Sequence, residues 1–168
     1  MKRIIVLIFL FLSFGMISAQ KFCYIDMEFI LSNIPEFQQA QHELDLISEQ
    51  WQSEIQSRSS VVKEMQRKFE VEEVLYTDEV RKTKIREIGL KEKALSDFTQ
   101  SKYGSNGELF KKRQELIKPI QDAIYEAVEK LAKDKKYDFV LDKSAGITIL
   151  YAKTSYDKSD LVLKYLGY

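Results

Sequence analysis

The sequence is poor in the residues that cross-link small proteins or interrupt helices. Its 168 residues include one cysteine, two prolines, six glycines and one histidine. The single cysteine, Cys23, excludes an intrachain disulfide framework and a cysteine-based zinc site. Few glycines and prolines, combined with 31% charged residues, favour long helices. We therefore expect a largely helical chain that holds no metal.

An excess of charge of one sign is also lacking. Lys and Arg number 26 and Asp and Glu number 26, so the formal net charge is zero. A protein that binds nucleic acid generally, or anionic membranes, would show a basic excess. The composition therefore argues against both of these partner classes.

Residues with catalytic chemistry are equally sparse. Gly104 and Gly107 are not followed by the Lys-Ser/Thr pair of a phosphate-binding loop, which argues against ATP-driven work. His42 lies off the apolar face of its segment and is most simply a solvated residue. Four carboxylates fit caps and turns better than an acid–base pair; they are Asp26, Glu28, Asp138 and Asp142. We find no catalytic constellation and predict a protein that is not an enzyme and uses no cofactor.

Residues 1–19 have the pattern of a cleaved signal peptide. Two basic residues precede the almost wholly apolar run 4–17, and the small residue Ala19 stands where a signal peptidase would cut. The run is short for a membrane span. Cys23 follows Gln-Lys-Phe rather than the small uncharged residues that precede a lipidated cysteine, so we interpret it as a buried strand residue.

The segment after the signal peptide predicts a strand and a short helix. Residues 22–27 alternate between two faces, as in a short, mostly buried strand. Asp26 can cap a brief helix that runs through Leu31. Asn33 can then cap the next helix, with Pro35 in its first turn and a glutamate three residues after the cap.

The pattern from residue 36 onward is helical, without glycine or proline up to residue 75. Apolar residues recur every three or four positions, at Phe37, Ala40, Leu44, Ile47, Trp51, Ile55, Val62, Met65 and Phe69. One stutter, between Trp51 and Ile55, should locally unwind a supercoil. A stripe this narrow indicates pairing with one long partner helix.

The partner helix is predicted to follow a turn at residues 76–77. Thr77 is a suitable cap, and Asp78 and Glu79 place negative charge in the first turn, where the helix dipole favours it. The second helix carries its own apolar stripe, at Ile85, Ile88, Leu95, Phe98, Leu109, Phe110, Leu116, Ile117, Ile120, Ile124, Val128 and Leu131.

The position of the turn also predicts how the two helices pair. Facing residues should have numbers that add up to about 153, which places Leu44 opposite Leu109 and Phe69 opposite Lys84 and Ile85. Acid–base pairs four residues apart should form a solvated outer surface; they are Glu54–Arg58, Glu64–Lys68, Asp78–Lys82, Glu87–Lys91 and Glu108–Lys112.

The return helix contains one irregular stretch, residues 101–107. Glycines in a helix interior cost about 1 kcal/mol each relative to alanine, and Gly104 and Gly107 both fall here. The predicted pairing places them near residues 47–49 and close to Trp51. We interpret this stretch as a break or hinge in the arm; a local kink without function is an equally open alternative.

Near the C-terminus the apolar period changes from 3.6 to 2. Residues 137–141 and 147–151 alternate around a turn at 143–146, which predicts a β-hairpin. Asp157 can cap a last short helix, which Gly167 would end. Three short strands and one small helix make too small a core to stand alone, so we predict that the aromatic strands form a subunit interface with edges paired between chains.

Together these elements predict an α+β protein with a small β-rich oligomerisation body and a long antiparallel coiled-coil hairpin arm. The body comprises residues 20–34 and 119–168, and the arm comprises residues 35–118, with its tip near 76–78 and a hinge at 104–107.

This order of elements, with KFCYIDMEFIL at the start and YDFVLDKSAGITILYA near the end, resembles the Skp/OmpH family of periplasmic chaperones for outer-membrane proteins. The stretch GELFKKRQELIKPIQDAIYEAVEKLAKDKKYDFVLDKS resembles that family most strongly. The resemblance implies a periplasmic homotrimer whose arms hold unfolded outer-membrane β-barrel proteins without ATP. It implies that the trimer contacts lie around Phe22, Tyr24, Tyr137, Phe139, Leu141, Ile149 and Tyr151.

The resemblance also implies many weak client contacts along the arms. Our candidates are apolar residues off the seam or at its end, namely Val74, Leu75, Tyr76, Tyr103 and Phe110; the same residues can instead complete the hairpin core. Well-known members are strongly basic, whereas residues 36–118 here contain 15 basic and 16 acidic residues. Binding to lipopolysaccharide or anionic membrane is therefore left open, and a structural or adaptor coiled coil that docks one folded envelope partner is the competing hypothesis.

Overall fold

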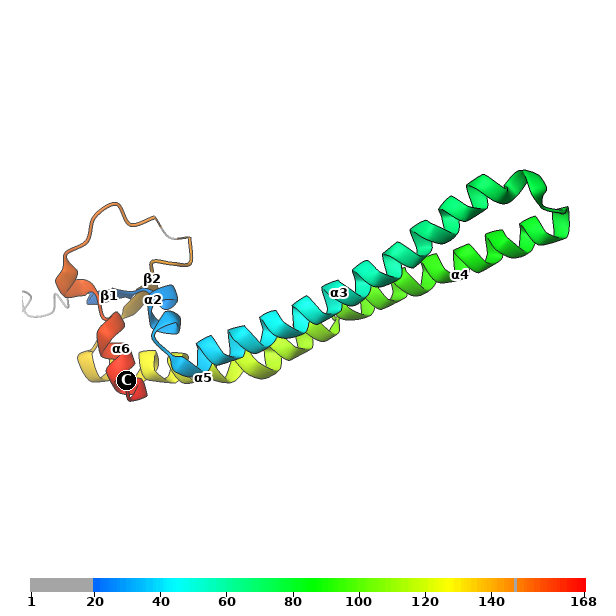
Figure 1. Ribbon diagram of the computed structural model, residues 1–168. Coiled ribbons are helices and arrows are strands. Elements are labelled where there is room, and N and C mark those ends of the chain that lie inside the picture. The colour runs from blue at the N-terminus through cyan, green and yellow to red at the C-terminus, as the bar shows by residue number, and fades with distance from the viewer. Residues whose placement is uncertain (1–19, 147) are drawn as a thin grey trace, which may run out of the picture. The chain divides into compact units, whose positions relative to one another are not determined.

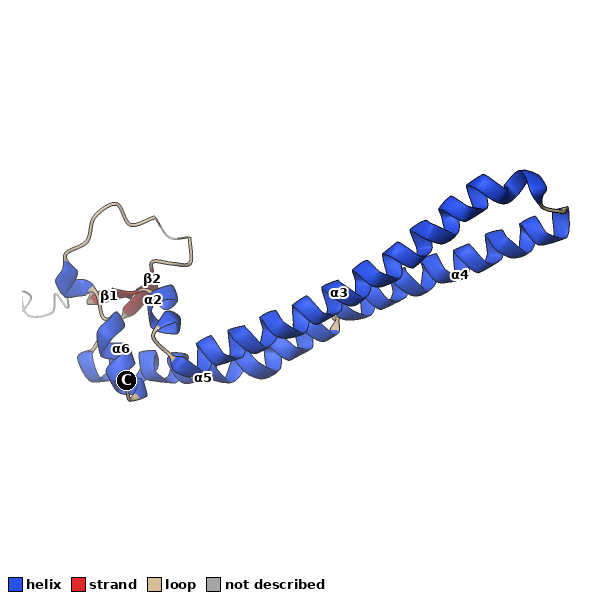
Figure 2. Cartoon of the chain, viewed as in Figure 1, coloured by secondary structure: helices blue, strands red, loops and turns tan. Residues whose placement is uncertain are grey.

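The computed structural model describes residues 20–146 and 148–168 (Figure 1). The predicted signal peptide and Ile147 of the predicted hairpin lie outside the described residues. The described residues form two compact units, one of Ile34–Ala123 and one of residues 20–33 together with the described residues between Ile124 and Tyr168. The first unit is built of helices, and the second combines helices with two short strands (Figure 2). The predicted α+β class with a long helical hairpin is confirmed.

The hairpin begins with α3, Pro35–Glu72, which runs unbroken for 38 residues. A 3₁₀ turn, η1 at Glu73–Leu75, leads to α4, Asp78–Tyr103, and then to α5, Glu108–Lys135. The prediction that Asn33 caps α3 is wrong. Ile34 is the N-cap, and its aliphatic side chain makes no cap bond. The Asn33 side chain instead donates to the carbonyl of Phe29 in the preceding helix.

The predicted pairing of the two helices of the arm is confirmed along the hairpin. Towards the tip, Phe69 and Lys84 line one cavity, as do Met65 and Ile88. Beyond the irregular stretch, Leu109 packs against the cluster that contains Leu44. Both sets of pairs have numbers that add up to 153, so residues 104–107 advance along the arm by the same amount as one turn of the continuous helix opposite.

The turn at the tip and the break in the return helix both lie where the sequence predicts them. Thr77 caps α4, and its hydroxyl oxygen accepts a 3.4 Å hydrogen bond from the amide of Val80. The helix α4 ends at Tyr103 and α5 begins at Glu108. Gly107 is buried in the connection, and a Cβ there would lie 2.7 Å from the carbonyl oxygen of Lys102. The break therefore requires glycine at this position.

The second unit contains a parallel pair of strands, β1 at Phe22–Ile25 and β2 at Phe139–Asp142. Phe22 pairs with Phe139, and Tyr24 pairs with Leu141. Short helices surround them: α2 at Met27–Ser32, the 3₁₀ turn η2 at Thr154–Tyr156 and α6 at Ser159–Leu166. Gly167 ends α6 with a φ of 99°, a left-handed conformation that glycine adopts without strain.

The predicted β-hairpin is wrong in the described residues. The chain from Thr148 to Ala152 forms no strand, and β2 pairs with β1 instead. Leu150 and Tyr151 are 95% and 82% exposed, so these side chains are not buried against any other part of the same chain. Alternation of apolar residues predicts a strand only where one face can be buried.

The core of this unit is small and well enclosed. Its fully buried side chains come from several elements; they are Cys23, Ile30, Ile124, Leu131 and Val162. Asp26 caps α2, as predicted, and accepts a 3.0 Å hydrogen bond from the amide of Phe29. Within the described residues, every helix is too short or too polar to cross a membrane.

Candidate functional site

The seam between α3 and α4 is only loosely packed towards the tip. Within the described hairpin, α4 contains no buried residue. Val62 is buried on α3 but borders a cavity of about 200 Å³ that also reaches Arg58 and Leu95. A denser cluster lies at the other end of the arm, where Ala40, Leu44 and Ile117 are buried together. The arm is therefore fastened most firmly far from its tip.

Large apolar side chains are exposed all along the hairpin, outside its seam. They are Leu46, Val61, Val71, Val74, Leu75, Val80, Ile85, Leu90 and Phe110, each between 40% and 84% exposed. Five of these residues, Leu46, Val61, Val71, Val80 and Leu90, were not predicted as seam residues or exposed contacts, although all but Val80 lie one or two positions from seam residues. Counting positions around the helix would have found those four, because such neighbours face away from the partner helix.

The five predicted client contacts have different environments. Val74 and Leu75 are 84% and 81% exposed at the tip, and Phe110 is 47% exposed on α5. Tyr76 is half-buried, with its ring 6.1 Å from that of Phe69 and its hydroxyl donating to Glu72. Tyr103 lies between the helices, and its hydroxyl donates to the Ser48 carbonyl.

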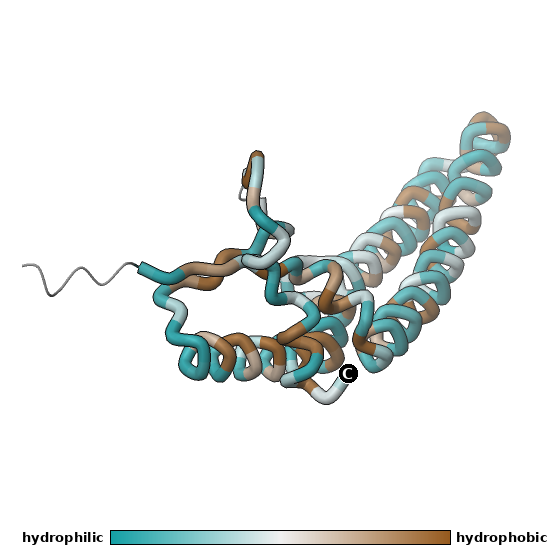
Figure 3. Tube along the Cα trace, turned by 90° about the vertical axis from the view of Figure 1, so that its left-hand side faces the viewer, coloured by the Kyte–Doolittle hydropathy of each residue, from teal (hydrophilic) through white to brown (hydrophobic). Residues whose placement is uncertain are grey.

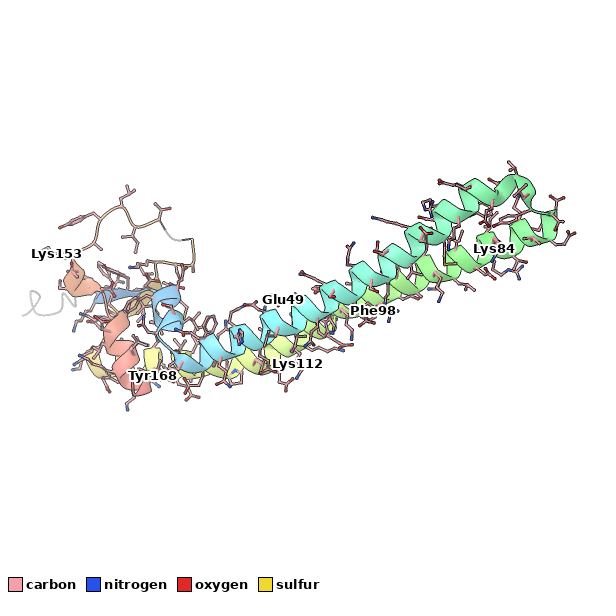
Figure 4. The ribbon with its side chains drawn as sticks, viewed as in Figure 1. Glu49, Lys84, Phe98, Lys112, Lys153 and Tyr168 are labelled. Carbon is pink, nitrogen blue, oxygen red and sulfur yellow. The ribbon has the colours of Figure 1, made fainter. Side chains whose placement is uncertain are left out.

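A lysine is held among aromatic rings beside the break. The ammonium of Lys102 lies 4.9 Å from the ring centre of Trp51 and 5.4 Å from that of Phe98. Phe98 is labelled on the hairpin in Figure 4. It forms a 2.6 Å ion pair with Glu108, the first residue of α5, and its side chain is only 16% exposed. The pair joins the two helices across the break, so Glu108 does not pair with Lys112 as the sequence predicted; Lys112 pairs with Glu115.

In the second unit, one face of the strand pair is left uncovered within the chain. The opposite face carries Cys23 and Ile25, which are 0% and 3% exposed. On the uncovered face, Phe22 and Phe139 are 49% and 55% exposed, and Phe22 stacks on Tyr156 at 5.3 Å between ring centres. The structure thus brings together four of the predicted interface residues, Phe22, Tyr24, Phe139 and Leu141, through the strand pairing.

The remaining interface candidates lie apart from that face or in the loop. Tyr137 is half-buried beneath the ammonium of Lys21, at 4.8 Å. Ile149 and Tyr151 lie in the irregular segment and line an open cavity of about 640 Å³, together with Tyr24 and Asp26. Tyr156, which contacts Phe22, was not predicted because no periodic pattern includes it.

Lys143 supplies the main ion pairs at the edge of this cavity. Its ammonium lies 3.0 Å from Asp26 and 3.8 Å from Asp157. The amide of Phe29 and the Lys143 ammonium hold the pKa of Asp26 below its usual value, and the bond to Asp26 raises the pKa of Lys143. Asp157 also accepts hydrogen bonds from Ser159, 3.0 Å from its amide and 2.6 Å from its hydroxyl. These groups tie the ends of β1 and β2 to the start of α6.

The arrangement offers no reactive centre in the described part of the chain. Cys23 is fully buried, and burial raises the pKa of its thiol, which disfavours the nucleophilic thiolate. No group of three or more His, Cys, Asp or Glu side chains in residues 20–146 and 148–168 is placed to hold a metal ion. His42 is exposed on α3, and what the surface offers is apolar contact area and charge.

Comparison with known proteins identifies the architecture. A candidate outer membrane chaperone (OmpH-like) from Caulobacter crescentus CB15, known from a crystal structure, matches with a TM-score of 0.65 and 13% sequence identity. The match covers 89% of this chain and 85% of that chain, and at this identity it shows the fold alone. No curated protein matches the sequence. The pattern that defines the OmpH family, described as outer membrane protein (OmpH-like), matches residues 21–166, and the chain therefore belongs to the OmpH-like family, as its resemblance to Skp/OmpH proteins predicted.

Proposed function

We propose that this protein is an ATP-independent periplasmic holdase, which binds unfolded outer-membrane β-barrel proteins between helical arms and prevents their aggregation. Membership of the OmpH-like family supports a chaperone role in general. The observation that carries the holdase proposal is the series of exposed apolar side chains along the arm, from Leu46 to Phe110. Small, separate apolar contacts suit an unfolded chain, because their individually weak binding adds up through multivalency.

The proposal requires several arms around one client, and we propose that the strand-containing unit joins three copies of the chain. The uncovered face with Phe22 and Phe139 supports this, because a two-stranded sheet with exposed aromatic residues gains stability when another surface covers it. Gly104 and Gly107 would allow the arms to bend and the space between them to widen. The family and the predicted signal peptide support a periplasmic location.

Sedimentation velocity on the secreted protein tests the assembly. We expect a particle of three times the chain mass. Phe139→Ser should shift it towards smaller species, because a hydroxyl replaces an aromatic ring in the interface. Leu90→Ser, which changes a side chain 62% exposed on α4, is the matched control and should leave the mass unchanged. A wild-type monomer, or equal behaviour of the two variants, would overturn the proposed interface.

Dilution of a urea-unfolded outer-membrane barrel into the protein tests the holding activity. We expect aggregation, followed by light scattering, to be suppressed at stoichiometric amounts, with a complex of one client per trimer. The effect should depend only weakly on salt, because the arms contain nearly equal numbers of basic and acidic residues. A protein that leaves the client to aggregate but binds one folded envelope component would instead be the structural adaptor.

A further inference from the structure

Two lysines occupy seam positions in the outer half of the arm, between the break and the tip. Facing residues of the two helices have numbers that add up to 153, so Lys91 stands opposite Val62 and Lys84 stands opposite Phe69. A lysine at a core position of a coiled coil lowers its stability. Figure 3 shows hydrophilic and hydrophobic colours alternating along both helices of the hairpin. The outer half of the seam is therefore apolar on α3 but interrupted by charge on α4.

The charged ends of both lysines lie outside the seam. Lys84, which is labelled in Figure 4, has a side chain that is 45% exposed, and its ammonium forms a 3.0 Å ion pair with Glu87 on the same helix. Lys91 is exposed. A lysine stem covers some apolar surface while its ammonium stays in water, but an unbranched stem fills less of a seam than leucine or isoleucine does.

Each lysine borders a cavity in the seam. The cavity at Lys91 has a volume of about 200 Å³ and is also lined by Val62 and Leu95. The cavity at Lys84 has a volume of about 120 Å³ and is also lined by Phe69. An apolar cavity of about 150 Å³ in a protein holds a benzene ring. Both cavities are therefore of the size of one apolar side chain.

The two cavities repeat along one side of the helix pair. Lys84 and Lys91 are seven residues apart, which is two turns of a helix and about 10 Å along its axis. The proposed client offers suitable side chains one at a time, because the strands of an outer-membrane barrel alternate apolar and polar residues. The polar neighbours of an inserted side chain would stay outside the seam, beside the ammonium groups.

The same chain closes its seam elsewhere. Ala40, Leu44 and Ile117 are buried together at the other end of the arm, whereas α4 contains no buried residue. The open packing is therefore confined to the outer half, where the two lysines stand.

We propose that Lys84 and Lys91 keep the outer half of the seam open, and that its two cavities bind single apolar side chains of an unfolded client. The inference rests on the proposed holdase function and names where on the arm the client is held. This site differs from the exposed apolar side chains of the arm, because it lies between the two helices. Filling the seam would exclude the client.

The variant Lys84→Leu/Lys91→Leu tests the site by filling it. The leucines should pack against Phe69 and Val62 and raise the melting temperature, measured by circular dichroism. The same variant should bind a labelled, urea-unfolded outer-membrane barrel about tenfold more weakly, measured by fluorescence anisotropy after dilution. A tenfold loss corresponds to about 1.4 kcal/mol, which is within what burial of one apolar side chain provides. Leucines that merely added apolar surface to the arm would strengthen binding instead.

Two variants with the same change of net charge make the test specific. Lys82→Leu/Lys93→Leu places leucine at exposed positions of α4 outside the seam, and it should neither raise the melting temperature nor weaken binding. Lys84→Gln/Lys91→Gln removes the seam charges without filling the cavities, so it should weaken binding less than the leucine variant does.

The outcomes separate this inference from the proposed function. A leucine variant that melts higher but binds the barrel as tightly as wild type would overturn the inference and leave the holdase proposal intact. Equal weakening by the glutamine variant would also overturn it, because loss of charge would then be the cause. An unchanged melting temperature would contradict the packing on which the inference depends. A wild-type protein that leaves the barrel to aggregate would overturn the proposed function itself.

Discussion

The hydroxyl of Tyr103 donates a 2.8 Å hydrogen bond to the backbone carbonyl of Ser48 on the opposite helix of the hairpin. The same hydroxyl lies 3.1 Å from Ser48 Oγ. Its ring meets Trp51 edge to face, with 6.1 Å between ring centres. Tyr103 is the last residue of α4, so these contacts fasten the return helix to α3 directly before the break.

Replacement of Tyr103 by phenylalanine should lower the free energy of unfolding by about 0.5–1.5 kcal/mol, the usual net value of one hydrogen bond. The ring contact with Trp51 would be kept. Urea unfolding followed by circular dichroism measures the change. Tyr125→Phe, at a site 65% exposed, is the control and should have almost no effect; equal losses in the two variants would contradict a role for the Ser48 bond.

A continuous return helix should make the arm stiffer. The four-residue variant Gly104→Ala/Ser105→Glu/Asn106→Gln/Gly107→Ala should form one more helical turn without shifting the pairing. Facing residues on the two helices have numbers that add up to 153 both before and after the break, so the alignment already allows for one full turn. Far-ultraviolet circular dichroism should show increased helix content. If the break is a hinge, this variant should hold small barrels normally and large ones poorly.

The single variant Gly107→Ala is the comparison for the break. Here the added Cβ meets the Lys102 carbonyl while the loop is retained, so we expect lower stability rather than a stiffer arm. Equal holding of small and large barrels by the four-residue variant would show that the break is a local kink without function.

A comparison of Leu44 with Leu46 distinguishes the role of buried packing in the arm from the role of its exposed surface. Leu44 is 2% exposed in the core cluster, whereas Leu46 is 46% exposed. Leu44→Ala should lower the free energy of unfolding by about 2–5 kcal/mol through reduced burial and a cavity, and Leu46→Ala should lower it by less than about 1 kcal/mol. Leu46→Ala should instead weaken client holding. Thermal unfolding and the light-scattering assay distinguish the two effects, and similar melting temperatures would contradict the packing described.

The pair of Asp26 and Lys143 predicts a dependence of stability on pH. The folded state lowers the pKa of Asp26 below its ordinary value, chiefly through the hydrogen bond from the Phe29 amide and also through Lys143. The corresponding stabilisation is therefore complete above the ordinary pKa and is lost as the pH falls through the lowered pKa. Asp26→Asn keeps a cap acceptor for Phe29 but removes the charge pair. Its stability relative to wild type should be lower at about pH 6, and the difference should shrink as the pH falls through the lowered pKa of Asp26; a constant difference would refute the linkage.

The local elements of this fold could be predicted from short stretches of sequence. Thr77 and Asp26 cap their helices, and Gly167 ends the last one, as residue type and position indicate. The pairing of α3 with α4 could also be predicted from sequence. The position of the turn sets which residues face each other, and the apolar stripe of each helix sets which side packs against the other. Asn33 was wrongly assigned because two neighbouring helix ends compete for one polar side chain.

The candidate surfaces were less accessible to sequence reasoning. Val74 and Leu75 could be placed at the tip from the turn alone, but Tyr103 required knowledge of the Ser48 carbonyl opposite it. Ile85 was placed on the seam by its spacing and is 54% exposed, because the seam is narrow near the tip. Exposure depends on which side of a helix its partner covers, and spacing in sequence specifies that only to within one position.

The sequence by itself determined the helical hairpin, its turn, its break and the distribution of charge along it, because caps, glycines and apolar periodicity act over a few residues. Only the tertiary structure decided that β2 pairs with β1 instead of with residues 148–152, and that Lys102 pairs with Glu108 across the break. Strand pairing and ion pairs between separate elements depend on which groups folding brings together. Residues 22 and 139 are far apart along the chain, and no local pattern encodes their contact.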